Sequence, residues 1–137
     1  MTHQIVRLNP PTLPDAASIG YSQISVFEAG RLAFISGQVA LAADGSPVPE
    51  DLAEQARIVA QNARAALDAI NAGPENIVMA RAYVTDLTPE RLEAMMPPML
   101  DFFEGAQPSL TGIGVAALAA PEFQIELEMT VQIPAKS

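Results

Sequence analysis

The stretch FQIELEMTVQI, residues 123–133, decides the fold because it carries the least ambiguous structural signal in the chain. Its apolar residues alternate strictly with polar ones, which is the period of a strand with one buried face and one polar face. The apolar set is Phe123, Ile125, Leu127, Met129, Val131 and Ile133, and the polar set is Gln124, Glu126, Glu128, Thr130 and Gln132. The sequence therefore predicts a half-buried strand here.

Residues 109–118 form a short, uncharged and largely apolar run just before that stretch. This run predicts a second strand, antiparallel to the last one and joined to it through residues 119–122. One face of it would carry Leu110, Gly112 and Gly114 in succession. Glycines inside a strand offer nothing to pack, so two on one face indicate a hollow or a close backbone approach. We take this hollow, beside Glu126 and Glu128, as a first candidate site.

Composition limits the classes of protein to which the chain can belong. Its 137 residues, half of them apolar, predict one globular domain over residues 1–137. A net charge of -9 opposes binding to nucleic acid or to anionic membranes. We find neither a membrane-spanning run nor a secretion signal, so we expect a cytoplasmic protein. The absence of cysteine excludes thiol catalysis and disulfides.

The first third of the chain predicts three short strands. Residues 3–8 could form an edge strand, and the prolines that follow enforce an extended loop. Residues 24–28 and 32–39 flank a turn-forming Ala29-Gly30-Arg31, which predicts an antiparallel hairpin.

Two helices and one further strand are expected between residues 50 and 103. Apolar residues recur at helical spacing from about residue 50 to 72, and Gly73-Pro74 would end that helix. Residues 76–86 are β-branched enough for a central strand, with small residues on one face. Thr88 and Pro89 would begin a second helix, which Pro97-Pro98 should divide into two pieces. The order β-β-β-α-β-α-β-β fits helices on one face of a mixed sheet, an α+β fold.

Several motifs, in this order, resemble the Rid family of enamine/imine deaminases, also called YjgF or L-PSP proteins. They are Gly20-Tyr21-Ser22-Gln23, the run LAFISGQV at residues 32–39, the run AYVTDL at residues 82–87, Phe102-Phe103 and the run QIELE at residues 124–128. The resemblance spans nearly the whole chain. It implies a chorismate-mutase-like fold, a homotrimer with ligand clefts between subunits, and no organic cofactor or metal. Active members hydrolyse 2-aminoacrylate-type enamines and imines to 2-keto acids.

The departures from the family pattern bear on activity. Active deaminases of the family carry an arginine two residues after the proline that opens the penultimate strand, and here Leu110 stands at that position. By the resemblance, Tyr21, Gly37 and Glu126 would still contribute to the cleft, with Glu126 activating water or polarising the ligand and Tyr21 beside it. Gly112 would widen the corner next to Leu110.

Each of these residues also has a purely structural interpretation. Glu126 could be a solvated residue on a polar strand face. Arg81 could replace the missing arginine in ligand binding, but we favour an ion pair with Glu126 or Glu128, because an arginine among carboxylates is readily neutralised. The methionines of the second helix are expected in the core. His3 stands alone, which opposes a metal site, and the GxGxxA pattern at residues 112–117 lacks the following helix of a dinucleotide site.

Two functions therefore remain open on the sequence. The first is a small-molecule-binding trimer without the family's standard deaminase activity. The second is an enamine/imine deaminase of altered specificity that uses Tyr21, the backbone around Gly37, and Glu126. The direction in which Arg81 points discriminates between them.

Overall fold

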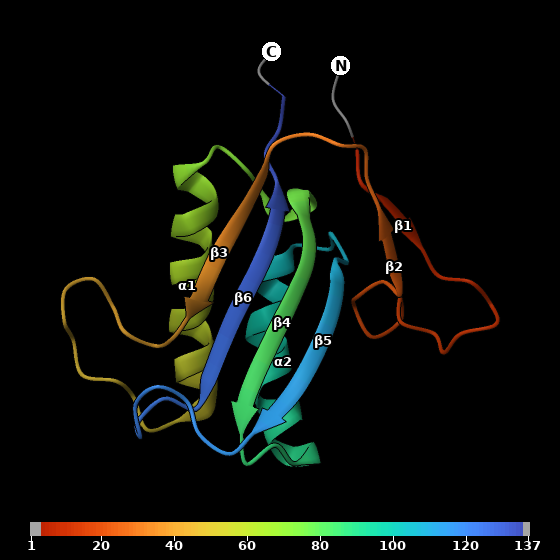
Figure 1. Ribbon diagram of the computed structural model, residues 1–137. Coiled ribbons are helices and arrows are strands. Elements are labelled where there is room, and N and C mark those ends of the chain that lie inside the picture. The colour runs from red at the N-terminus through yellow and green to blue at the C-terminus, as the bar shows by residue number, and fades with distance from the viewer. Residues whose placement is uncertain (1–3, 136–137) are drawn as a thin grey trace.

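The structure, a computed structural model, describes residues 4–135 as two layers and a small side sheet (Figure 1). Four strands in the order β3-β6-β4-β5 form a mixed sheet, and both helices cover one face of it. The elements are β3 (Leu32–Gln38), α1 (Leu52–Ala69), the 3₁₀ turn η1 (Pro74–Asn76), β4 (Ile77–Thr85), α2 (Pro89–Phe103), β5 (Ser109–Val115) and β6 (Ile125–Gln132). The two-stranded side sheet is β1 (Val6–Leu8) with β2 (Ile24–Val26). The predicted α+β class is confirmed.

Strand β6 lies at the centre of the sheet and has the alternation that its sequence predicts. Its apolar residues are buried, with Ile125, Leu127 and Val131 fully covered. β4, the other central strand, buries its small residues Ala80 and Ala82 against the helices. The opposite face of both strands carries the polar side chains and has no helix over it.

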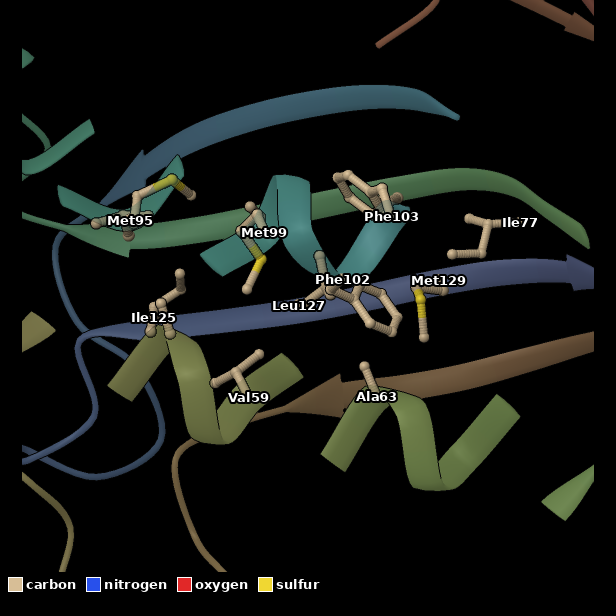
Figure 2. Packing of buried hydrophobic residues seen from close by; sticks show 14 of the residues in the cluster. Val59, Ala63, Ile77, Met95, Met99, Phe102, Phe103, Ile125, Leu127 and Met129 are labelled. Carbon is tan, nitrogen blue, oxygen red and sulfur yellow. The ribbon is translucent and has the colours of Figure 1, made fainter. Parts of the chain in front are cut away.

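The core fills the space between this sheet and the two helices. Figure 2 shows Val59 and Ala63 of α1 and the methionines and phenylalanines of α2 converging on β6. Met95 and Met99 are buried, as predicted, whereas Met96 is half-buried. One buried polar residue was not anticipated: Gln55 donates to the carbonyls of Pro49 and Glu122 and accepts from the amide of Gln124, so α1 is tied to the loop before β6.

The expected antiparallel pair of the last two strands is wrong. β5 pairs only with β4, in parallel, and β6 runs antiparallel between β3 and β4. The reason is α2, which carries the chain back across the sheet and so supplies the long connection that parallel strands need. The loop between β5 and β6 then passes the end of β4, and Thr85 donates to the carbonyl of Gln124 there.

The expected hairpin over residues 24–39 is also wrong. β2 pairs with β1, where Val26 faces Val6 and Ile24 faces Leu8, while β3 pairs with β6. The turn around Gly30 therefore carries the chain from one sheet to the other. The long-range pairing of β3 with β6, whose apolar and polar residues alternate regularly, outweighs the local turn sequence.

The structure corrects the predicted ends of α1 and the predicted break in α2. Asp51 caps α1 by accepting from the amide of Glu54, and the residue with left-handed backbone after this helix is Asn71 rather than Gly73. α2 runs unbroken through Pro97 and Pro98 instead of dividing. Over residues 4–135, neither helix is long and apolar enough to cross a membrane.

Candidate functional site

A group of charged and polar side chains lies on the open face of the sheet, opposite the helices. β4 contributes Arg81 and Tyr83, and β6 contributes Glu126 and Glu128. The antiparallel register sets Arg81 opposite Glu128 and Tyr83 opposite Glu126. Residues of the same parity on paired strands share a face, so the four side chains form one cluster.

Glu128 contacts two of the other three residues in this cluster. Its Oε1 accepts a short hydrogen bond from the Tyr83 hydroxyl and lies 3.6 Å from Nη1 of Arg81. The ion pair that we favoured for Arg81 is therefore present, with Glu128 as the partner. Because both side chains of the pair are more than a third exposed, its contribution to stability is small. Its main effect is that the charge of Arg81 is already paired with a carboxylate of the same chain.

We expect Tyr83 to ionise above the usual tyrosine pKa of about 10. Its hydrogen bond to Glu128, followed by desolvation and the negative charges of Glu128 and Glu126, raises the pKa of Tyr83. Stabilisation from this proton is present below about pH 10 and is lost as pH rises through the raised value. Absorbance titration of tyrosinate, with Tyr83→Phe subtracted, measures it.

The matched control for this titration is Glu128→Gln, which keeps the shape of the acceptor but removes its charge. The pKa of Tyr83 should then return toward about 10. A Tyr83 pKa at or below 10 in the wild-type protein would contradict the hydrogen bond described here.

Gly37 and Glu126 form the second feature of this face, at its border with β3. A side-chain carbon built on Gly37 would lie 2.4 Å from the carboxyl carbon of Glu126, so only glycine lets this carboxylate lie over the β3 backbone. The strand register shifts between Ile35 and Gln38, which places Gly37 at a bulge. Glu126 has no hydrogen bond or ion pair with any residue that the structure describes. Its carboxylate is available to a ligand.

Tyr21 and Leu110 lie at another corner of the molecule. Ser22 forms a bridge with Ser109, and its amide donates to the carbonyl of Pro108, so the Tyr21-Ser22 segment joins the start of β5. Tyr21 is half-buried there. The hydroxyl of Ser22 is buried and has no hydrogen-bond partner among the described residues.

A polar network that the sequence did not reveal holds this corner together. Ser25 accepts from Arg7 and shares a 2.7 Å hydrogen bond with Ser109, and Arg7 also donates to the carbonyl of Ile77. Burial lowers the pKa of Arg7. The network fixes the side sheet to the main sheet. The position of Arg7 within a short edge strand did not predict that it would join the two sheets.

The hollow expected beside Glu126 and Glu128 is not formed by the glycines of β5. Leu110 and Gly112 are in register with Ala80 and Ala82, which face the helices, and Leu110 packs against the edge of the core. Glu126 and Glu128 project from the opposite face, and β4 separates β6 from β5. Open space surrounds the position where a side chain would stand on Gly112.

Within the single chain, the candidate residues thus fall into two groups. Gly37 and Glu126 adjoin the cluster around Arg81 on the open face, whereas Tyr21, Leu110 and Gly112 belong to the region around β5. Two strand spacings, about 10 Å, separate β6 from β5. Over residues 4–135, no three or more His, Cys, Asp or Glu residues gather as a metal site would require, and His3 lies outside the described residues.

Known proteins resemble the chain over almost its full length. The family model of endoribonuclease L-PSP matches residues 13–133. The RutC family protein YjgH of Escherichia coli is 32% identical over 112 residues, 80% of this chain and 82% of YjgH. The crystal structure of YyfB, a Rid family protein of unknown function from Yersinia pestis, superposes with a TM-score of 0.88 at 36% identity, covering 94% of this chain and 98% of YyfB. The TdcF structure from E. coli with bound serine gives 0.67 at 25% identity, covering 82% and 87%.

Proposed function

The chain belongs to the endoribonuclease L-PSP family, the YjgF or Rid proteins, and we propose that it is a homotrimer that binds a small metabolite between subunits. We place it in the cytoplasm, with a chorismate-mutase-like fold and without cofactor or metal. We further propose that it lacks the standard 2-aminoacrylate deaminase activity. TdcF, a relative of the same fold, has been crystallised with serine, which supports a ligand of metabolite size.

The observation that carries this proposal is the open sheet face. Glu126 presents an unengaged carboxylate over Gly37, yet the cavities of about 390 to 650 Å³ described in the single subunit are lined by neither residue. A ligand at Glu126 therefore needs a second surface above the sheet. Phe34, on β3 and in register with Thr130 of this face, is 78% exposed, which is unusual for a large aromatic side chain. A neighbouring subunit would cover both features.

The loss of deaminase activity is argued from the charges near the candidate residues. Leu110 stands where active relatives have their carboxylate-binding arginine, and it packs toward the core. Arg81 is on the other face of the sheet and is paired with Glu128. The open face thus carries two carboxylates and one guanidinium that is already paired with one of them. The resulting negative charge disfavours the binding of anionic substrates, including RNA.

The alternative is an enamine/imine deaminase of altered specificity. The feature that favours it is Glu126, a carboxylate with no described partner that could activate water beside the Gly37 backbone. Such an enzyme would act on an uncharged or cationic imine. A hydrolytic assay on amine-derived imines, compared between wild type and Glu126→Gln, separates this alternative from binding alone.

Sedimentation or light scattering tests the assembly. We expect a mass of three chains at micromolar concentration and dissociation by Phe34→Asp, because a buried carboxylate at a subunit contact is costly. Leu92→Asp is the matched control: Leu92 is 42% exposed but lies on α2, on the helical side of the molecule. A single-chain mass for the wild type would refute the trimer.

A further inference from the structure

Gln132, the last residue of β6, contains a buried polar atom that the fold does not satisfy. The side chain is 4% exposed, and its Nε2 donates to the carbonyl of Glu28 at 2.7 Å. Its Oε1 is buried and has no hydrogen-bond partner among residues 4–135. Buried acceptors nearly always have a partner, because leaving one unpaired costs free energy. The missing partner must come from outside the described chain.

Gln132 is one of the residues that line a cavity. The cavity lies at the end of the sheet where β6 ends and β3 begins, and this end of the two strands is at the top of Figure 1. Its volume is about 480 Å³, within the range of sites for small organic ligands. The wall is formed by the β2–β3 turn, the end of η1 and the segment after β6. The lining residues are Ala29, Gly30, Arg31, Asn76, Gln132, Ile133, Pro134 and Ala135.

Arg31 gives this cavity a positive charge. Three other arginines, Arg57, Arg64 and Arg81, form ion pairs with glutamates. The Arg31 side chain has no hydrogen bond or ion pair with any residue in the described part of the chain. It also lines a neighbouring cavity of about 650 Å³ at the end of α1, and none of the described residues that line either space is acidic. Although the chain has a net charge of -9, the local charge at this cavity is positive and favours the binding of an anion.

Asn76 adds a neutral donor to the wall. Its Oδ1 accepts from the amide of Gly73 at 2.9 Å, which leaves the Nδ2 hydrogens for another partner. The wall of the cavity therefore contains a charged donor and a neutral donor, and the buried acceptor belongs to a third residue of the same wall. The matching ligand has an anionic group for Arg31 and an O–H or N–H group for Gln132.

We propose that this cavity binds a small carboxylate that carries a neighbouring hydroxyl or amino group. The carboxylate pairs with the Arg31 guanidinium, and the hydroxyl or amino hydrogen satisfies Oε1 of Gln132. The site is separate from the cleft proposed at Glu126, because Arg31 and Gly37 stand at opposite ends of β3, about 20 Å apart along an extended strand. It adds a second ligand to the protein and does not depend on the first.

Three small probes that differ by one group each test the site by NMR titration of the ¹⁵N-labelled protein. Glycolate has both the carboxylate and the hydroxyl, acetate lacks the hydroxyl, and glycolamide lacks the charge. We expect saturable shifts of the Gly30, Arg31 and Gln132 amides with glycolate. Acetate and glycolamide should each bind about tenfold more weakly, as expected for the loss of one hydrogen bond to a charged or buried group.

Substitutions of Arg31 and Gln132 test whether these two residues bind glycolate. Arg31→Met should weaken glycolate binding by about tenfold or more, whereas Arg57→Met, which removes an exposed arginine outside the cavity, should leave it unchanged. Gln132→Met should abolish the preference for glycolate over acetate. If Gln132→Met does not fold, the preference of the wild-type protein for glycolate over acetate still tests whether the ligand hydroxyl is recognised.

Three results would overturn the proposal. They are an absence of saturable shifts with glycolate, which would mean that water alone fills the cavity; equal affinities for glycolate and acetate; and unchanged binding in Arg31→Met. Glu126→Gln should bind glycolate like the wild type. Altered binding in that variant, whether tighter or weaker, would place the probe in the proposed intersubunit cleft instead, and would also overturn the proposal.

Discussion

Replacing Leu67 by alanine should lower the free energy of unfolding by about 2–5 kcal/mol, because a fully buried side chain is lost and a cavity is left behind. Leu67 lies on the face of α1 that packs on the sheet and is 0% exposed. Urea denaturation of wild type and variant measures the difference. The protein concentration must be the same in every measurement, because dissociation of the proposed trimer would contribute to the apparent stability.

Leu92→Ala is the control for this substitution. Leu92 is a leucine on the other helix with 42% of its surface exposed, so its truncation should change the free energy of unfolding by no more than about 0.5 kcal/mol. A change of that small size for Leu67→Ala would mean that α1 does not bury the face described here.

The wild-type protein should hydrolyse iminopropanoate at least about one hundred times less efficiently than relatives that carry the arginine. A guanidinium that holds a carboxylate makes two charge-assisted hydrogen bonds, each worth about 1.5–3 kcal/mol. Losing even about 3 kcal/mol of transition-state binding lowers kcat/KM by roughly two orders of magnitude. Leu110 supplies neither bond, and Glu126 adds repulsion toward the substrate carboxylate.

The assay uses enzymatically generated iminopropanoate with wild type, Leu110→Arg and Leu110→Met. Leu110→Arg should gain binding of small 2-keto acids without reaching full activity, because Gly112 leaves open space next to that position. Leu110→Met keeps an apolar side chain of similar volume and should behave like the wild type. Robust turnover by the wild type would refute the claim and would direct attention to Arg81 as a substitute.

Residue periodicity predicted which side of the two central strands is buried. The alternation in β6 and the small residues of β4 placed their apolar sides correctly, because a strand has only two faces and one of them meets the helices. The same pattern cannot say which strand is the neighbour. β5 was therefore assigned to β6 instead of β4, and β2 to β3 instead of β1.

The site was predictable only where a local pattern existed. The resemblance assigned Gly37 and Glu126 to one cleft, but their direct contact was not predicted. The pairing of Arg81 with a glutamate was predicted from charge. The buried hydrogen bonds of Gln55 and the unsatisfied oxygen of Gln132 depend on backbone groups far away in the sequence. Such long-range contacts leave no trace in composition or spacing.

The strand order also determines when the protein can fold during its synthesis. β6 is the last strand in the chain, yet it lies between β3 and β4 and completes the ladder of each. Until β6 has left the ribosome, β3 has no partner in the main sheet, and β4 has only β5. Pairings across such sequence separations form slowly. We therefore expect the nascent chain to expose the apolar faces of both helices until β6 joins the sheet, and to be prone to aggregation during that time.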